Sequence, residues 1–271
     1  MSTISSLKKL HLPKDWHTDL TILELTGSTI EQKDGYIVVR TRENPNYHWG
    51  NCILVLDESS IQDAQRWVNQ FHTEFPHVDW VAIALPTMPA DRSTWNAFGI
   101  DLGQLELWHA TEVFGGLQLP PEYTIRLLEG ADWEQLSRKE IEDSIDTLQY
   151  DQIIHEEFVR KQNNSRELLC KQGKAAWFGA FFGSEIVGNL GIVVCESTGR
   201  YQSVEVAKNH QRLGIASFLR GAAGRWSKER GCDNWAIVAE ASGDARRVYQ
   251  KAGFYLAGGS VAAYAYRSAA E

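Results

Sequence analysis

Residues 204–231 read VEVAKNHQRLGIASFLRGAAGRWSKERG and combine the end of a strand, a loop and a helix. The alternation of Val204, Glu205 and Val206 is typical of a strand. From Ala216 onward the apolar residues recur at helical spacing until Gly231, where the pattern stops. Residues 211–216, Gln-Arg-Leu-Gly-Ile-Ala, therefore form a loop that leads into a helix.

The loop around Gly214 allows two interpretations. The first N–H groups of a helix have no partner inside it, and the positive end of the helix dipole lies there, so a phosphate or pyrophosphate can bind. A Cβ at Gly214 would hold the ligand away or strain a positive φ. An ordinary turn explains the same residues, because single-glycine loops are common.

The residues that follow favour the first interpretation. Residues 235–239, WAIVA, predict a strand, and residues 242–254, SGDARRVYQKAGF, predict a short helix. This order resembles the GNAT superfamily of acyl-CoA-dependent N-acyltransferases. Its loop motif Q/R-x-x-G-x-G/A is met by Gln211, Gly214 and Ala216. Its later motif N-x-x-A-x-x-L-Y-x-K-x-G-F is met, with serine for asparagine and valine for leucine, at Ser242, Ala245, Val248, Tyr249, Lys251, Gly253 and Phe254.

The resemblance implies acetyl-CoA (coenzyme A) as a co-substrate. In the family, loop N–H groups hold the pyrophosphate, and a strand N–H polarises the thioester carbonyl, here near Val204–Val206. The cofactor-binding residues expected on this basis are Val204, Val206, Gln211, Arg212, Leu213, Gly214, Ile215, Ala216, Ser217, Ser242, Ala245 and Tyr249.

Two residues are candidates for proton transfer. Tyr249 occupies the position of the family's general acid for the coenzyme A thiolate, although a tyrosine there could also simply pack the short helix on the sheet. Glu205 is a candidate base, but it comes later on its strand than the glutamate of many relatives. A solvated glutamate at this position, with an ordered water as base, explains the sequence equally well.

Composition sets the outer bounds. The chain has 271 residues, and no apolar run approaches the roughly 20 residues that span a membrane. Four cysteines without a C-x-x-C pair indicate reduced thiols in a cytoplasmic protein and no metal site. From Arg200 onward the net charge is +5, whereas the remainder carries −13. This distribution suits an anionic cofactor in the second half and disfavours nucleic acid as a partner.

The first half predicts a similar order of elements without the binding loop. Strands are expected at residues 20–25, 36–40, 52–56, 81–85 and 105–108, and helices at 60–75 and 93–100. The residues before its longer helix, Asp57-Glu58-Ser59-Ser60, contain no glycine and carry two carboxylates that would repel a pyrophosphate. We therefore expect this half to be a degenerate GNAT-like domain that does not bind coenzyme A.

Together these observations predict an α/β fold with two GNAT-like domains, each a mixed, mostly antiparallel sheet flanked by helices. The expected domains are residues 1–118 and 122–271, with the boundary in the Gly- and Pro-rich stretch between them. The resemblance implies an N-acetyltransferase (an EC 2.3.1-type acyltransferase) that acts on a primary amine of a small molecule or peptide. It implies neither a metal nor a membrane, and either a monomer or a homodimer. The alternatives are a catalytically silent acyl-CoA sensor and an aminoacyl transferase of the tandem-GNAT kind.

Overall fold

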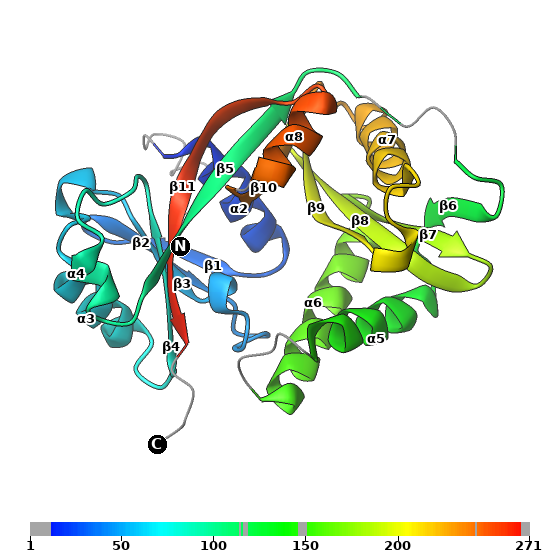
Figure 1. Cartoon of the computed structure of the whole chain (residues 1–271). Helices are drawn as coiled ribbons and strands as arrows, with labels where there is room; N and C mark the ends of the chain where they lie inside the picture. The colour runs from blue at the N-terminus through cyan, green and yellow to red at the C-terminus, as the bar shows by residue number, and fades with distance from the viewer. Residues whose placement is uncertain (1–11, 114, 116–118, 146–150, 242, 267–271) are drawn as a thin grey trace.

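A computed structural model describes residues 12–113, 115, 119–145, 151–241 and 243–266 (Figure 1). Its strands form one sheet of eleven strands in the order β1-β2-β3-β4-β11-β5-β10-β9-β8-β7-β6. Of the paired strands, β3–β4 and β9–β10 are parallel and the rest antiparallel. Helices cover both faces, which confirms the expected mixed α/β class.

After its opening helix and a strand at residues 29–32 that was not predicted, the first half follows the predicted order. The turn at Asp34-Gly35 joins a hairpin, and Gly35 there has φ +81°. The elements are α2 (Lys14–Leu25), β1 (Thr29–Gln32), β2 (Tyr36–Arg40), β3 (Cys52–Val55), α3 (Ala64–Glu74), β4 (Trp80–Leu85), α4 (Ser93–Asn96) and β5 (Asp101–Ala110).

The second half contains the strand, loop and helix predicted from residues 204–231. In Figure 1, α7 lies on one face of its strands and α5 and α6 lie on the other. The elements are β6 (Tyr123–Leu127), α5 (Asp132–Ser144), α6 (Gln152–Lys171), β7 (Ala175–Phe182), β8 (Glu185–Cys195), β9 (Thr198–Val206), α7 (Ile215–Lys228), β10 (Asn234–Glu240), α8 (Gly243–Lys251) and β11 (Tyr255–Tyr266).

The two halves exchange their last strands. β5 belongs to the first half in sequence, yet it pairs with β10 of the second half along six residues. β11 comes from the end of the chain, yet it pairs with β4 of the first half, and β5 and β11 also pair with each other. Figure 1 shows these two long strands running between the halves. The sheet is therefore shared, and the predicted sequence boundary at 118–122 adjoins residues 116–118, which lie outside the described part.

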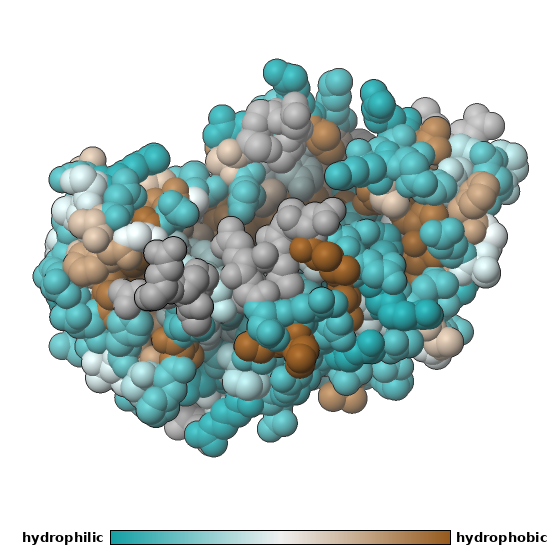
Figure 2. Space-filling model, turned by 60° about the horizontal axis from the view of Figure 1, so that its bottom comes forward, coloured by the Kyte–Doolittle hydropathy of each residue, from teal (hydrophilic) through white to brown (hydrophobic). Residues whose placement is uncertain are grey.

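Packing follows the same exchange. Trp108 of β5 is 1% exposed and belongs to the core cluster under α7, together with Tyr201, Leu219 and Trp235. The face shown in Figure 2 is largely hydrophilic, and hydrophobic residues reach it in separate patches. Most of the described large apolar side chains are buried inside the shared structure.

The strand predicted at residues 20–25 is wrong, because these residues form the second half of α2. Trp16, Leu20 and Leu23 are buried and lie at the spacing of one helix face. Pro13 lies at the N-cap of this helix. The β-branched and aliphatic residues at 20–25 resemble a strand when they are considered alone. The helical spacing that begins at Trp16 shows that they belong to a helix.

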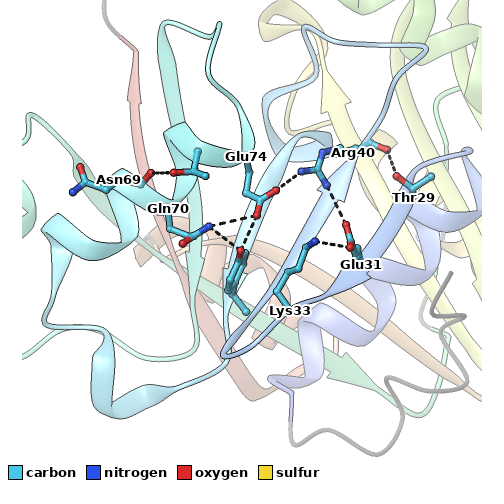
Figure 3. A network of polar contacts seen from close by, with 9 residues as sticks. Thr29, Glu31, Lys33, Arg40, Asn69, Gln70 and Glu74 are labelled. Atoms are coloured by element: carbon cyan, nitrogen blue, oxygen red, sulfur yellow. Dashed lines mark hydrogen bonds and ion pairs between the residues drawn. The ribbon is translucent and has the colours of Figure 1, made fainter.

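A polar network fastens α3 to the first hairpin (Figure 3). The carboxylate of Glu74 accepts hydrogen bonds from Tyr36 Oη, at 2.7 Å, and from the Arg40 guanidinium. Gln70 Nε2 donates to Tyr36 Oη at 2.8 Å, and Arg40 also pairs with Glu31 at 3.6 Å. These contacts hold α3 of the first half against β1 and β2.

Candidate active site

The N-terminus of α7 offers unpaired backbone N–H groups. Its N-cap, Gly214, has φ +83° and supplies no side-chain cap. Phe218 N–H donates to the Gly214 carbonyl at 3.1 Å, so the N–H groups of Ile215, Ala216 and Ser217 precede the first helical bond. An L-residue with a side chain would be strained at this left-handed position. Glycine therefore keeps the helix end open, as phosphate binding requires.

The loop before α7 is anchored to the end of β9. Gln211 Nε2 donates to the Val206 carbonyl at 3.0 Å. Arg212 has φ +64°, which is uncommon for a residue with a side chain. Leu213 is exposed. The chain thus turns sharply between the strand and the helix. In this structure the Gln211 side chain forms its hydrogen bond with the backbone of β9.

β9 and β10 separate beside this loop. Their parallel pairing covers three residue pairs and stops at Ala236↔Arg200. β9 nevertheless continues to Val206, and β10 continues to Glu240. We call the separated segments, residues 201–206 and 237–240, the fork. Backbone groups on its facing edges lack the strand partner that a continuous parallel ladder would supply.

The fork also contains a β-bulge. The register between β8 and β9 shifts, and Ser203 has φ +47°. Arg166 of α6 donates to Ser203 Oγ at 2.9 Å and to Glu140 of α5 at 3.0 Å. Asn163, which is 2% exposed, donates to the same glutamate at 2.9 Å. A mostly buried polar network therefore holds the bulge in place.

Glu205 projects from the fork toward α5 and α6. It stands opposite Asn189 of β8, on the same face of β9 as Gln202. The residue is exposed by its overall area, but burial of its carboxyl group is the main cause that raises its pKa, and the charge of Glu140 raises it further. A carboxylate with a raised pKa can accept a proton near neutral pH.

Tyr249 of α8 is half-buried beside the fork's base. Its ring centroid lies 5.9 Å from that of Trp108 and 6.1 Å from that of Phe254. Burial raises the pKa of Tyr249, while the positive charges of Arg200 and Arg220 lower it. The net shift is upward, so the phenol keeps its proton at neutral pH and is available as an acid.

Arg220 is a buried cation that the motif comparison does not single out. The residue is 8% exposed, and within the described structure its Nε has no hydrogen-bond partner and its guanidinium no ion pair. Its Nη2 donates only weakly to Ser217 Oγ, at 3.4 Å. Burial lowers the pKa of Arg220. The one sequence signal for this residue was an arginine among the apolar residues of the predicted helix. In the structure, Arg220 adds positive charge near the first turns of α7.

The other expected residues fall at or near these elements. Val206 is half-buried against the cluster under α7, and Val204 is 37% exposed. Ser242 and the side chain of Ala245 lie outside the described residues. His210, just before the loop, forms a hydrogen bond with Tyr123 Oη at 2.8 Å.

The corresponding helix of the first half, α3, begins differently. Its N-cap Asp63 accepts a hydrogen bond from the N–H of Arg66 at 3.0 Å. Asp57, in the loop before it, accepts one from the N–H of Ser59 at 3.0 Å. Carboxylates therefore occupy the N–H groups that an anion would need. This arrangement agrees with the expectation that the first half does not bind coenzyme A, which stays a prediction.

Comparison with known proteins agrees with this geometry. Residues 133–254 match the model of the acetyltransferase (GNAT) family. The second half of the chain therefore belongs to the GNAT superfamily of acyltransferases. Among curated proteins, none matches the sequence.

Solved structures match over almost the whole chain. A protein of unknown function from Staphylococcus epidermidis has a TM-score of 0.67 at 14% identity, with 89% of this chain and 95% of that one covered. A GCN5-related N-acetyltransferase from Kribbella flavida has a TM-score of 0.61 at 10% identity, covering 94% and 95%. A tandem GNAT protein from the clavulanic acid biosynthesis pathway has a TM-score of 0.53 at 13% identity, covering 96% and 99%. At these identities the likeness shows a shared fold.

Metal-ligand clusters and long apolar helices are absent from the described residues. No group of three or more His, Cys, Asp or Glu side chains there is placed to hold a metal ion. None of the described helices is both long and apolar enough to cross a bilayer.

Proposed function

We propose that the protein is an N-acetyltransferase that uses acetyl-CoA as donor and a primary amine as acceptor. The observation that carries this proposal is the open N-terminus of α7 at Gly214, set beside the fork between β9 and β10. A phosphate-binding helix end next to unpaired strand edges fits a long anionic thioester. The buried, unpaired Arg220 adds the charge that such a ligand would neutralise.

Each candidate residue has a role in this reaction. Bound acetyl-CoA would supply a thioester whose acetyl carbon is attacked by the amine and whose thiolate leaves. Backbone N–H groups of 212–216 hold the pyrophosphate, and a β9 N–H near the Ser203 bulge orients the acetyl carbonyl. Glu205, directly or through a water, takes the proton from the amine, and Tyr249 Oη gives a proton to the leaving sulfur.

The test is calorimetric titration with acetyl-CoA, comparing Gly214→Glu with Gly231→Glu. Both glycines have a left-handed φ, +83° and +90°, so both substitutions carry a similar backbone strain of about 1 kcal/mol. Only Gly214→Glu places a carboxylate at the start of α7, whereas Gly231 follows its end. We expect one site per chain, weakened at least about 100-fold in Gly214→Glu because like charges repel, and retained in Gly231→Glu. Equal binding by both variants would refute the assignment of the loop, and two sites per chain would show that the first half also binds.

A further inference from the structure

A cavity of about 480 Å³ lies between the two halves and ends at the fork. One wall is the buried face of α2 with Trp16, and another is the loop before β3 with Trp49. β5 and β11 form the floor, and Tyr264 of β11 contributes to it. Gln202 of β9 and Glu240 of β10 lie on the lining as well, so the cavity reaches the place where the proposed donor would expose its acetyl group.

The lining is apolar along most of its length. Aliphatic and aromatic side chains from both halves make up the greater part of it, and no Lys, Arg or His is among the described residues that line it. Such a surface favours an apolar body and leaves the hydrogen bonds of a polar one unmade. Tryptophan and tyrosine rings also attract a cation placed over their faces.

Three carboxylates interrupt this lining. Asp19 is already paired, because Arg200 Nη2 lies 3.0 Å from its Oδ1. Glu240 and Asp101 are exposed and form no ion pair with a described residue. In the register of β5 with its neighbours, Glu240 stands opposite Leu105 and Asp101 opposite Tyr264. The two carboxylates are thus separated by four residues of strand, or about 13 Å, and Glu240 is the one at the fork.

We propose that this cavity binds the acceptor, and that the acceptor is a small primary amine with one positive charge and an apolar or aromatic body. Its ammonium group lies at Glu240 and Gln202, and its body extends between α2 and β11. This inference rests on the proposed function for its place in the reaction, but the binding site is defined by the cavity itself. The inner amines of a polyamine and the hydroxyls of a sugar would lie unpaired against the apolar walls, and anionic acceptors would meet only carboxylates.

The first experiment measures binding, without turnover. 2-Phenylethylamine, its neutral counterpart 2-phenylethanol and the polycation spermidine are titrated calorimetrically into the full-length protein, alone and with saturating unacetylated coenzyme A. We expect 2-phenylethylamine to bind at one site, about tenfold or more tightly than the alcohol, because a charged hydrogen bond with Glu240 is lost in the alcohol. Spermidine should bind more weakly than 2-phenylethylamine. Tighter binding of spermidine or of the alcohol would overturn the proposal.

Three variants locate the site. Gly103→Leu places a side chain in the cavity. There is room for it, because the nearest atom to an added Cβ is the Ala262 carbonyl oxygen at 3.9 Å. The variant should weaken the binding of 2-phenylethylamine at least about tenfold. Glu240→Gln should remove the preference for amine over alcohol. Asp101→Asn is the matched control, and it should change affinity by less than about twofold because it removes a charge far from the fork. Unchanged binding in Gly103→Leu, or equal effects of the two acid variants, would contradict the proposal.

Acetyl-CoA binding to the same proteins separates this inference from the proposed function. If 2-phenylethylamine binds as expected but acetyl-CoA does not bind, the cavity inference stands and the donor assignment fails. If acetyl-CoA binds but 2-phenylethylamine binds neither with nor without coenzyme A, the cavity inference fails and the proposed function stands. Retained acetyl-CoA binding by Gly103→Leu would also show that this variant is folded.

Discussion

At the scale of single residues, Tyr249 shows how position and environment decide a role. Its phenol lies among Trp108, Phe254 and the fork, where burial raises its pKa. A phenol that holds its proton at neutral pH can donate it to the departing thiolate as the carbon–sulfur bond breaks. The motif predicted the position of the tyrosine, whereas its protonation state follows from the packing.

Tyr249→Phe should separate catalysis from binding. We expect kcat to fall about 100-fold, because a general acid contributes on that order, while the affinity for acetyl-CoA changes little. Tyr255→Phe is the control, since Tyr255 is exposed and its hydroxyl only meets His109 Nδ1 at 2.8 Å. Steady-state kinetics at saturating acetyl-CoA give the answer, and equal kcat values for both variants would remove Tyr249 from the mechanism.

Asp15 is the second residue whose environment sets its behaviour. The side chain is fully buried in α2, its Oδ2 accepts a hydrogen bond from Ser260 of β11, and its Oδ1 has no hydrogen-bond partner in the described structure. Burial raises the pKa of Asp15 from 3.8 to about 6. Because the folded pKa exceeds the unfolded one, the neutral acid stabilises the fold fully below about pH 3.8, and this stabilisation is lost as the pH rises toward 6.

Asp15→Asn tests this directly, because the amide keeps the shape and cannot ionise. The shift corresponds to about 3 kcal/mol, so the variant should gain up to that amount relative to the wild type at pH 7.5 and little at pH 4. Urea denaturation at both pH values measures the difference. A variant that is destabilised equally at the two pH values would show that Asp15 is not titrating in this range.

At the scale of elements, the bulge in β9 depends on α5 and α6. Arg166 and Glu140 are 15% and 14% exposed in their side chains, and Arg166 also bonds to Ser203. Arg166→Met should cost about 3 kcal/mol of unfolding free energy, because it leaves a buried carboxylate unpaired. It should also lower activity, because the bulge loses the hydrogen bond between Arg166 and Ser203.

Arg160→Met on the same helix is the control. Its pair with Glu134 is 44% and 54% exposed, so we expect a loss below about 1 kcal/mol. Equal losses, measured by urea denaturation, would argue against the network.

The elements also show where sequence patterns suffice. Local signals, such as the helical spacing of apolar residues after Ala216 and Gly214 before α7, predicted structures that depend on a few neighbouring residues. The strand predicted at 20–25 failed because Trp16, outside that window, completes the helix face of Leu20 and Leu23. The bulge could not be predicted, since a positive φ at Ser203 is maintained by Arg166, which is 37 residues away in sequence.

At the scale of the whole molecule, the exchange of β5 and β11 means that both halves contribute strands to the sheet and residues to the lining of the cavity. The sequence predicted a strand at residues 105–108, within β5, and the short helix at 242–254 that precedes β11. Pairing between residues far apart carries no local signal, so the exchange itself could not be predicted. Asp101 and Glu240, at the two ends of the cavity, are 139 positions apart in the sequence. The candidate phosphate loop could therefore be predicted from the sequence, whereas the candidate acceptor site could not.

The shared sheet predicts that the two halves unfold together. Ile83 of β4 lies in the core of the first half and Ile192 of β8 in that of the second, and both are fully buried. Ile83→Ala and Ile192→Ala should each cost about 2–5 kcal/mol. Because β11 bonds to β4 and β5 bonds to β10, neither half can lose its strands without opening the other. We expect differential scanning calorimetry to show one transition for the wild type and for each variant, lowered in both. If the halves were independent, Ile83→Ala would split the heat absorption into an early peak and an unshifted one, and the exchanged strands would then contribute little to the coupling.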